Sequence, residues 1–588
     1  MKLEELKAAT SLHDVARLLQ VKPSMLSYVL YTKPKSELYT KFEIPKRTGG
    51  VREISAPFSH LKLIQQRLAA ILLECTKELR KKTAVKSKNK NFVSRGVSHG
   101  FMPGHSIMTN GQAHITRRFV FNADLSDFFG SINFGRVRGF FIKDKNFSLA
   151  EKTATILAQI ACNDNKLPQG SPCSPVISNL LGHILDIALV DLARKNKCTY
   201  TRYADDLTFS TNKCIFPSDI ALKTKEDENS WVPGSELIRI VQRNGFDFNE
   251  RKTRMQYKDS RQEVTGLSVN RKVNVPASYR YTVRAMASNL FRTGKFEHIV
   301  KYKNASGDEI VSKSDGKANQ LLGMLSFIHQ VDVYNEALAV KNNQPVVGAP
   351  GRLELYRRAI YFDAFYAPER PVIVCAGKTD NTYIKHAIRS LFPKYPLLCE
   401  FDADGKPQLK IRLFKYADRR TAFVTKLGGG VGGLCHLIKY YSADLTNKFR
   451  APSPKHPVIM LIDNDSGADA IYGAIAGILK IQKPKGQKPF IHVCGNLYVV
   501  PTPFGPSSKK TSIEDFFDEA TLATQLNGKS FERENDADNQ HHYGKAAFAR
   551  DVVAKNAATI DFGGFQPILE RIEAAIRHYS ARTQQPIV

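Results

Sequence analysis

The sequence predicts a multidomain protein of the α/β and α+β classes, and three observations lead to this assignment. The chain has 588 residues, which is long for a single hydrophobic core. Between about residues 39 and 270, short strand-like segments alternate with glycine and proline turns. Beyond residue 370, apolar strand-like segments alternate with helical patterns, which indicates a parallel sheet. We therefore expect two folded parts of different architecture.

The first long element is a predicted amphipathic helix over residues 59–80. Its apolar residues recur at helical spacing, namely Leu61, Ile64, Leu68, Ile71, Leu72, Cys75 and Leu79. From 276 to 340 the pattern is again helical and is rich in basic residues. Residues 342–351 contain Asn-Asn-Gln-Pro followed by further glycine and proline, which is typical of a linker region.

The clearest chemical signal is a pair of adjacent carboxylates, Asp205 and Asp206, between the strand-like segments 199–202 and 207–210. A third acid, Asp124, ends another strand-like segment. Three carboxylates in one cluster repel each other unless cations neutralise them, and two-metal nucleotidyl transfer uses such a cluster. Neighbours in a strand point to opposite faces, so we rank Asp205 above Asp206 as a direct metal ligand. Two acids also occur in ordinary surface turns, but the strand-like flanks favour the palm of a polymerase.

Several motifs in order resemble those of reverse transcriptases, and among them those of bacterial retrons. The matching segments are Tyr-Ala-Asp-Asp at 203–206, Asp-Leu-Ser-Asp-Phe-Phe at 124–129, Leu-Pro-Gln-Gly-Ser-Pro at 167–172 and the fingers-like segment 44–54. Val-Thr-Gly at 264–266 resembles the retron thumb tripeptide. Residues 110–114 resemble the retron element Asn-Ala-x-x-His, with Gly111 in place of alanine. The resemblance covers roughly the first 340 residues and implies a right-hand polymerase with fingers, palm and thumb.

The resemblance also implies roles for individual residues. Lys46 and Arg52 flank a Gly-Gly turn and are expected to contact an incoming triphosphate, although a solvated basic hairpin is the alternative. The other expected substrate-binding residues are Phe129 beneath the sugar, Gln169 and Gly170 near template or nucleotide, and Lys252 near the leaving phosphate. For Phe129 the alternative is core packing, and for Lys252 it is a surface position. The expected RNA-binding residues are Asn110, His114, Val264, Thr265 and Gly266.

The second part of the chain carries its own acidic site. The strand-like segments 371–375 and 457–462 end near Ala376 and Asp463, and functional residues gather at the carboxyl ends of parallel strands. Asp463 and Asp465 could share a cation there. The arrangement resembles the TOPRIM fold of topoisomerases, primases and overcoming-lysogenization-defect nucleases. That family has Glu-Gly-x-x-Asp after the first strand and Asp-x-Asp after a later one.

Ala376 stands where the TOPRIM family has its glutamate, although Gly377 and Asp380 follow as expected. Alanine cannot bind metal, so the site as written should be badly impaired. The chain is either a naturally degenerate binding module or carries a deliberate inactivating change, and the retention of the acids Asp380, Asp463 and Asp465 favours the second. Lys545 resembles a late lysine of the related nucleases that could neutralise a phosphate, or it lies on a helix surface. Glu514 and Asp515 are further candidate acids, or they start a helix.

Composition agrees with a nucleic-acid partner. The 86 lysine and arginine residues exceed the 56 acidic ones and give a net charge of +30, which favours binding to a polyanion. The nine cysteines contain no Cys-x-x-Cys pair, so the sequence indicates neither a zinc ribbon nor a disulfide framework. No signal peptide or membrane-spanning apolar segment is evident, and we expect a cytoplasmic protein without a membrane partner.

Together these features predict reverse-transcriptase helices, fingers and palm over 1–275, a thumb over 276–340, a linker over 341–366 and a TOPRIM-like nuclease domain with C-terminal helices over 367–588. By resemblance, the enzyme uses dNTPs and two Mg²⁺ ions to copy its own structured noncoding RNA into a branched RNA–DNA hybrid. The hybrid would silence the nuclease, which would use Mg²⁺ or Mn²⁺ on RNA or DNA, in a toxin–antitoxin type of anti-phage defence. A homo-oligomer is compatible with this expectation. The alternatives are a reverse transcriptase of another bacterial class with a degenerate TOPRIM module, and a non-enzymatic nucleic-acid scaffold.

Overall fold

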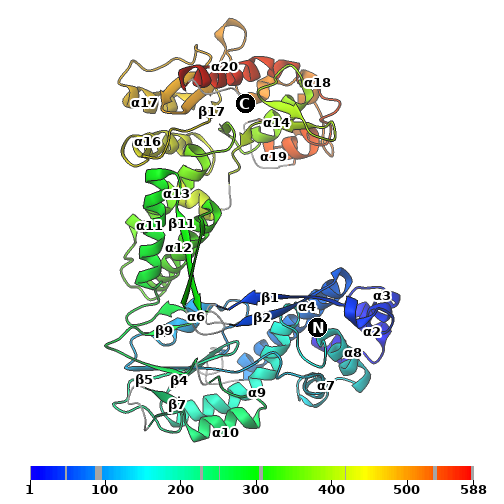
Figure 1. Cartoon of the computed structure of the whole chain (residues 1–588). Coiled ribbons are helices and arrows are strands. Elements are labelled where there is room, and N and C mark those ends of the chain that lie inside the picture. Colours follow the sequence, from blue (N-terminus) through cyan, green and yellow to red (C-terminus); the bar gives the residue numbers. More distant parts are fainter. Residues whose placement is uncertain are drawn as a thin grey trace. The chain divides into compact units, whose positions relative to one another are not determined.

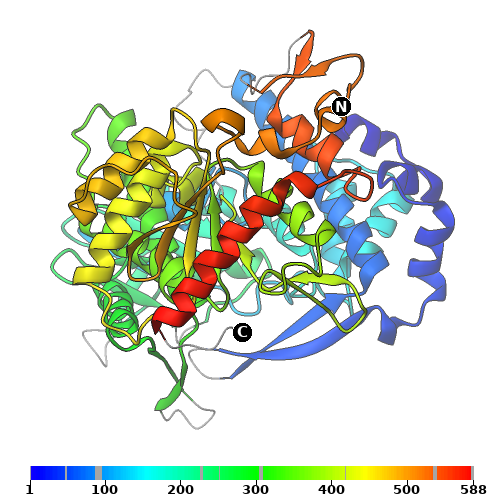
Figure 2. The same cartoon turned by 90° about the horizontal axis from the view of Figure 1, so that it is seen from above.

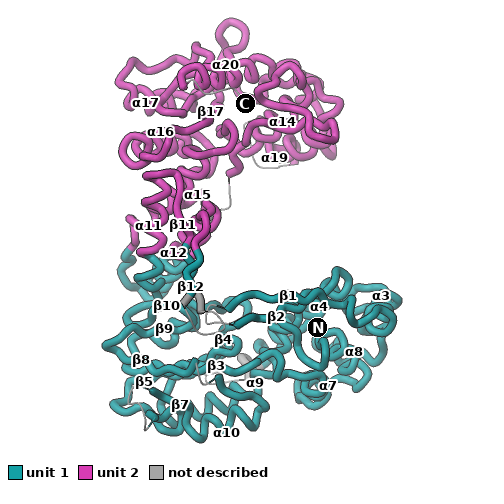
Figure 3. The backbone as a smooth tube through the Cα atoms, in the orientation of Figure 1, with its two compact units in different colours: residues 1–280, 299–312, 330–347 teal, residues 281–298, 313–329, 348–588 magenta. Residues whose placement is uncertain are grey.

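The computed structural model describes residues 2–46, 50–86, 96–224, 230–249, 252–303, 309–416, 419–533 and 540–583 (Figure 1). The chain divides into two compact units (Figure 3). Unit 1 contains Met1–Arg280, Ile299–Ser312 and Gln330–Val347, and unit 2 contains Tyr281–His298, Lys313–His329 and Gly348–Val588. The segment that resembles a thumb is therefore shared between the two units.

Unit 1 begins with short helices and a long hairpin. These elements are α1 (Lys2–Ala8), α2 (Leu12–Leu18), α3 (Pro23–Ser27), the π-helical turn η1 (Tyr28–Thr32), the 3-10 turn η2 (Lys35–Glu37), β1 (Tyr39–Pro45), β2 (Val51–Pro57) and α4 (Ser59–Lys86). Helix α4 confirms the helix predicted over 59–80 and extends it by six residues. Leu61, Ile64, Leu68 and Leu72 are buried along its inner side, as the apolar spacing predicts.

A four-stranded antiparallel sheet forms the centre of unit 1, in the order β4-β5-β3-β8. Its strands are β3 (Phe119–Asp124), β4 (Thr199–Tyr203), β5 (Asp206–Thr211) and β8 (Arg254–Tyr257). The surrounding helices are α6 (Ile107–Gln112), α7 (Phe134–Lys143), α8 (Glu151–Ala161), α9 (Ser174–Lys195) and α10 (Ser235–Arg243). Unit 1 also contains two separate small hairpins. One pairs β6 (Ala221–Lys223) with β7 (Trp231–Pro233), and the other pairs β9 (Glu263–Val264) with β10 (Leu267–Ser268).

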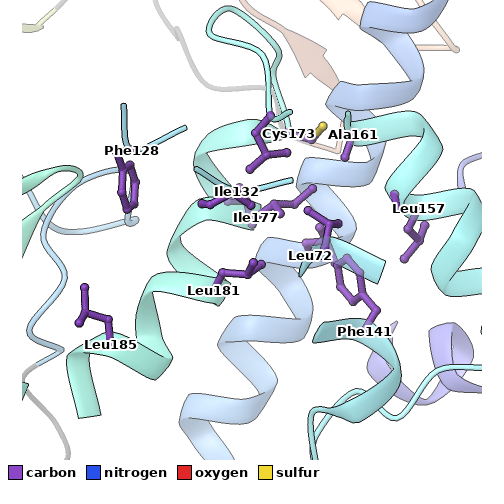
Figure 4. Packing of buried hydrophobic residues seen from close by; sticks show 14 of the residues in the cluster. Leu72, Phe128, Ile132, Phe141, Leu157, Ala161, Cys173, Ile177, Leu181 and Leu185 are labelled. Atoms are coloured by element: carbon purple, nitrogen blue, oxygen red, sulfur yellow. The ribbon is translucent and has the colours of Figure 1, made fainter. Parts of the chain in front are cut away.

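Helix α9 runs through the core of unit 1. Its residues Ile177, Leu181 and Leu185 are buried against side chains from α4, α7 and α8, including Leu72, Phe141 and Leu157 (Figure 4). Among the residues that the structure describes, α9 is the one helix long and apolar enough to cross a bilayer, and 61% of its most apolar stretch is buried within the fold. Core helices of folded domains commonly have this composition.

The segment 276–340 is helical only at its two ends. It consists of α11 (Ala277–Thr293), the strands β11 (Glu297–Lys303) and β12 (Glu309–Asp315), and α12 (Ala318–Lys341). The expectation of a continuous helical pattern is therefore wrong for the central residues. β-Branched pairs such as Ile299-Val300 and Ile310-Val311 favour strands there. Of the expected linker 341–366, only 342–349 lacks regular structure, because α13 (Pro350–Tyr361) and the π-helical turn η4 (Phe362–Tyr366) follow it.

Unit 2 contains a five-stranded sheet in the order β16-β13-β17-β19-β18. Its strands are β13 (Val372–Cys375), β16 (Arg412–Leu413), β17 (Val458–Ile462), β18 (Ile491–Cys494) and β19 (Leu497–Pro501). The first four in this order pair in parallel and β18 is antiparallel to β19, which confirms the predicted parallel sheet. The apolar runs of β13 and β17 are fully buried, as expected for strands covered on both faces.

Helices α14 (Asp380–Ser390), α16 (Val431–Asn447), α17 (Ala468–Leu479) and α20 (Gln566–Thr583) pack around this sheet (Figure 2). Helix α15 (Arg419–Thr425) instead contacts α13, where the Tyr361 hydroxyl donates to the Thr425 carbonyl. Helix α20 lies across one face (Figure 2), where Ile572 and Ile576 share a core with Ile459 and Val500. The smaller elements are β14 (Cys399–Phe401), β15 (Pro407–Leu409), η5 (Pro506–Ser508), η6 (Ile513–Phe516), α18 (Glu519–Leu522), β20 (Ser530–Phe531), β21 (His542–Tyr543), α19 (Lys545–Ala547), η7 (Phe548–Val553) and η8 (Gly563–Phe565).

Candidate active sites

The palm-like sheet brings the three predicted carboxylates to one edge. In the register of β3 and β5, Asp124 lies directly opposite Asp206. Asp205 belongs to the two-residue turn between β4 and β5, and its carbonyl accepts a hydrogen bond from the Leu125 amide at 3.0 Å. Asp124 ends β3 and Asp206 begins β5. The antiparallel pairing of these strands therefore brings together two segments that are distant in sequence.

These carboxylates destabilise each other's charged forms. Desolvation of Asp206, followed by the charges of Asp205 and Asp124, raises its pKa to about 7, although the residue is exposed at the start of β5 and solvent would reduce this shift. Burial and the charge of Asp124 also raise the pKa of Asp205. Lys252 partly offsets this repulsion, because its Nζ lies 2.9 Å from both carboxylate oxygens of Asp124. The lysine expected near a leaving phosphate is therefore paired with an acid of the site.

The donor set at this edge fits a divalent cation. Within the described parts of the chain, no three acidic, histidine or cysteine side chains already stand in the arrangement of a preformed metal centre. Asp124, Asp205 and Asp206 nevertheless supply carboxylate oxygens, which Mg²⁺ prefers, and one ammonium group does not neutralise three acids. A cation that bound them would displace Lys252 from Asp124 and lower the raised pKa values.

The predicted substrate residues lie around this edge with different degrees of support. Phe128 packs in the core on Phe246, at 5.4 Å between ring centres, whereas Phe129 is only partly buried. Phe129 as a selector of the sugar stays a prediction. Lys46 and Arg52 are exposed on the β1–β2 hairpin, and the Lys46 amide donates to the Gly50 carbonyl at 2.9 Å. Of the Gly-Gly turn between them, Gly49 lies outside the described residues.

Gln169 and Gly170 approach a protein strand. The Gln169 carbonyl accepts a hydrogen bond from the Ser55 amide of β2 at 2.7 Å. Gly170 has φ +117°, and a Cβ there would lie 2.7 Å from the Ser55 carbonyl oxygen. The absence of a side chain at Gly170 therefore serves contact with the fingers-like hairpin, while a contact of the Gln169 side chain with template or nucleotide stays a prediction.

Three of the five predicted RNA-binding side chains are in the protein interior, and their part in RNA binding stays a prediction. Asn110, His114 and Val264 are fully buried. His114 bonds through Nδ1 to Ser210 Oγ and through Nε2 to Thr201 Oγ1, both at 2.7 Å, and the Thr201 hydroxyl donates to Asn110 Oδ1 at 2.6 Å. The Asn-x-x-x-His element is thus an internal brace between α6 and the strands β4 and β5.

Thr265 and Gly266 form the turn between β9 and β10, with φ values of +48° and +78°. Val264 anchors this turn in a small core with Val120 and Val269. Gly266 is exposed and Thr265 partly so. Sequence could not separate the anchoring residue from the accessible ones, because it does not show which way each side chain faces.

A second acidic cluster lies at the carboxyl ends of β13 and β17 in unit 2. Asp463 follows β17, and its carboxylate accepts the Ile513 amide at 2.8 Å. Asp380 begins α14 and accepts the Gly377 amide at 2.6 Å. Glu514 is fully buried, and Lys545 Nζ lies 3.2 Å from its Oε1. Ala376 directly follows β13, which pairs with β17 in parallel.

Burial and the charges of this cluster also raise the pKa values of Asp463 and Asp380. Burial, together with the charges of Asp380 and Glu514, raises the pKa of Asp463 to about 7. Burial and the charge of Glu514 raise the pKa of Asp380. Lys545 contributes the opposing charge to both groups. The ion pair with Glu514 therefore supports the predicted place of Lys545 in this site over the alternative of a lysine on a helix surface.

Asp465 lies in the turn before α17. It is exposed, and its Oδ1 accepts the Gly467 amide at 2.7 Å. A cation shared by Asp463 and Asp465 stays a prediction. Sequence did not assign Glu514 a certain place in the site, but its charge acts on Asp463 together with that of Asp380. Both Glu514 and Asp515 lie in the first turn of η6, which confirms the helix-start interpretation, and Asp515 accepts the Ser512 amide in a capping box.

Comparisons with known proteins agree with the first site. Residues 44–270 match the family model described as "Reverse transcriptase (RNA-dependent DNA polymerase)". The chain is 34% identical over 293 residues to the Retron Mx65 reverse transcriptase of Myxococcus xanthus, with 46% of this chain and 61% of that protein covered. It is 28% identical to the Retron Ec86 reverse transcriptase of Escherichia coli, with 50% and 83% covered. The chain thus spans about three fifths of the length of the Mx65 relative.

Among solved structures, the chain is similar to telomerase from Candida albicans in complex with a fragment of telomeric RNA. The TM-score is 0.29 at 11% identity, with 55% of this chain and 63% of that chain covered. A score this low does not support any conclusion about the arrangement of the elements. The family match and the similarity to the two retron relatives are similarities of sequence. The matched residues 44–270 include Asp124, Asp205 and Asp206. Residues 44–270 are therefore similar in sequence to reverse transcriptases, and the two relatives described above are retron enzymes.

Proposed function

We propose that the chain is an RNA-directed DNA polymerase of the retron type that uses Mg²⁺. The observation that carries this proposal is the meeting of Asp124, Asp205 and Asp206 at one edge of the palm-like sheet, inside the segment that matches the reverse-transcriptase family. Reverse transcriptases generally use divalent metal ions. The raised pKa values of Asp205 and Asp206 support a site built to receive positive charge.

Two Mg²⁺ ions held by Asp124, Asp205 and Asp206 would lower the pKa of the attacking hydroxyl and neutralise the leaving pyrophosphate. The chain's own residues have the remaining tasks. Lys252, which pairs with Asp124 in this structure, would contact the leaving phosphate. Lys46 and Arg52 would hold the triphosphate from the exposed hairpin, and Phe129 would exclude a ribose 2′-hydroxyl.

The template in this proposal is the chain's own structured noncoding RNA, copied into a branched RNA–DNA hybrid. The names of the relatives, which are retron reverse transcriptases, and the net charge of +30 support this choice. The exposed turn at Thr265 and Gly266 is the part of the predicted RNA-binding set that RNA can reach. A cytoplasmic location belongs to the same proposal.

Sequencing the nucleic acid that copurifies with the chain tests this assignment. The proposal predicts one structured RNA species joined to DNA complementary to part of it. A copurifying pool with no DNA, or DNA unrelated to the bound RNA, would exclude the retron assignment. A reverse transcriptase of another bacterial class would instead extend added primers on unrelated templates.

We further propose that residues 367–588, within unit 2, are a TOPRIM-type metal-dependent nuclease that is inactive as written. Asp380, Asp463, Glu514 and Lys545 gather at the carboxyl ends of two parallel strands, and Ala376 occupies the position where another acid would complete the set. In this proposal the RNA–DNA hybrid keeps the nuclease silent until phage infection disturbs it. The alternative is a degenerate module that binds nucleic acid without cleaving it.

Ala376→Glu separates these two cases. The nuclease proposal predicts that the variant cleaves RNA or DNA with Mg²⁺ or Mn²⁺ once its hybrid has been degraded, and that adding Asp463→Ala abolishes the cleavage. Asp465→Ala in the same background tests whether that exposed acid shares the cation with Asp463, since loss of cleavage would place it in the metal site. No cleavage of either nucleic acid by Ala376→Glu would favour the degenerate module.

A further inference from the structure

The turn that carries Asp205 contains a residue in an unfavourable backbone conformation. Ala204 has φ +56°, in the left-handed region that residues other than glycine rarely adopt. It is buried, and with Asp205 it forms the entire connection between β4 and β5. Such a conformation persists only where the surrounding structure enforces it. The contacts of Ala204 therefore decide where the carboxylate of Asp205 is placed.

Ala204 is held on both sides of its peptide unit. Arg202 donates from one of its terminal guanidinium nitrogens to the Ala204 carbonyl at 3.1 Å. On the other side the backbone of Gly100 presses against the turn, since a Cβ at Gly100 would lie 2.6 Å from the Ala204 nitrogen. The turn thus fits between a buried cation and a close backbone contact.

Arg202 is itself held in one place by α9. Its side chain is fully buried and pairs with Asp186 through two hydrogen bonds of 2.8 Å. The Tyr200 hydroxyl donates to the same carboxylate at 2.9 Å. A Cβ at Gly182, one turn earlier on α9, would lie 2.8 Å from the guanidinium. Helix α9 therefore provides both the counter-charge and the space, and a two-point pair of this kind fixes the orientation of the guanidinium.

Stability alone does not explain this pair. A buried ion pair is often no more stabilising than apolar side chains of the same size, because both charges lose their hydration. Apolar side chains could not donate the hydrogen bond that Arg202 donates to the Ala204 carbonyl. The pair thus couples the core helix α9 to the turn that carries the carboxylates.

We propose that Arg202, fixed by Asp186 and Gly182, is a positioning residue that keeps Ala204 left-handed and so sets the carboxylate of Asp205 against Asp124 for divalent-cation binding. The inference rests on the proposed polymerase function for its cation. It implies that weakening Arg202 lowers metal affinity while RNA affinity stays at the parental level, since neither Arg202 nor Asp186 reaches the surface.

The test uses the full chain, four variants and Asp205→Asn as a reference for the palm signal. Arg202→Lys keeps the charge but cannot bond to Asp186 at two points and to Ala204 at once. Asp186→Leu with Arg202→Met removes both charges, so that no unpaired ion is left in the core if a single change prevents folding. Thr153→Val is the control: it deletes a buried hydrogen bond, 2.6 Å to the Ala9 carbonyl, in another part of unit 1. Ala204→Gly combined with Arg202→Lys tests rescue, because glycine adopts positive φ without strain.

Two readouts do not depend on activity. One is Mn²⁺ binding measured by electron paramagnetic resonance, taking as the palm signal the part that Asp205→Asn removes. The other is hydrogen exchange of the amides at 203–207. We expect Arg202→Lys and the double variant to lower Mn²⁺ affinity about tenfold or more and to speed exchange in the turn, with Ala204→Gly recovering much of the loss in the lysine variant. Thr153→Val should change neither.

Parental Mn²⁺ affinity and parental exchange in folded Arg202→Lys and double variants would overturn the inference. Equal losses in Thr153→Val would also overturn it, since general destabilisation would then explain the effect. If Asp205→Asn removes no Mn²⁺ signal from the parent, the polymerase proposal fails on its own. Exchange in the turn then still decides whether Arg202 holds Ala204.

Discussion

Replacing Asp463 with asparagine should stabilise unit 2 in the absence of metal, by an amount that grows as the pH rises from about 4 to about 7. In the folded chain, burial and the charges of Asp380 and Glu514 raise the pKa of Asp463 to about 7, from a usual value of 3.8. A raised carboxyl pKa means that the ionised form costs folding free energy. That cost is absent below pH 3.8, grows as the pH rises, and is complete above about 7.

The magnitude follows from the shift. About three pKa units at roughly 1.4 kcal/mol each give a ceiling of about 4 kcal/mol, and relaxation of the neighbouring acids would reduce this to about 2 kcal/mol. Asparagine keeps an oxygen that can accept the Ile513 amide, so the change removes the charge and little else. We therefore expect a gain in stability of about 2–4 kcal/mol at pH 8 and no gain at pH 4.

Urea unfolding of the full chain in EDTA, read by pulse hydrogen exchange, measures this gain. Peptides from β17 and α20 report unit 2, while the fluorescence of Trp231, the single tryptophan of the chain, reports unit 1 as an internal reference. Asp465→Asn is the matched control and should shift unit 2 by less than about 0.5 kcal/mol, because that acid is exposed. An equal gain at pH 4 and pH 8, or a loss at pH 8, would refute the assigned repulsion.

Three other changes address unit 1. Asp205→Asn should reduce primer extension with Mg²⁺ at least about 1,000-fold while RNA affinity stays within twofold, because asparagine keeps the shape and loses the charge; extension near the parental rate would count against the metal site. Phe129→Ala should reduce discrimination against ribonucleotides about tenfold in single-nucleotide incorporation, and unchanged selectivity would remove its role at the sugar. His114→Ala should cost about 3 kcal/mol in urea unfolding followed by Trp231, since two buried hydrogen bonds and a ring are lost. Its RNA affinity in salt titrations should stay parental, and a selective loss of RNA binding in a stable variant would contradict the internal brace.

Sequence was most informative where the chemistry is local. Asp205 and Asp206 are neighbours in a turn whose flanks are clearly strand-like, and Asp124 ends a strand, so the residue pattern alone is enough to group the three. The strands β13 and β17 were equally legible, because parallel strands buried on both faces are continuous apolar runs.

Sequence could not show which side chains face the interior. Asn110 and His114 form a motif that resembles one in RNA-binding enzymes, yet their hydrogen bonds to Thr201 and Ser210 depend on strands about 90 residues further along the chain. Glu514 joins Asp463 only because the chain returns to the sheet edge after β19. The apolar residues Ile513 and Phe517, one before and three after Glu514, are the sequence signal that could have distinguished it from Asp515.

RNA-dependent DNA synthesis on the copurifying RNA tests the central assignment most directly. The chain is purified with its RNA and supplied with labelled dNTPs and Mg²⁺. It should produce labelled DNA that is attached to the RNA, so that ribonuclease treatment shortens the labelled product. The Asp205→Asn protein should produce no labelled DNA. Labelled DNA formed equally by both proteins, or no product from the parent with either Mg²⁺ or Mn²⁺, would contradict the assignment of Asp124, Asp205 and Asp206 as the polymerase site.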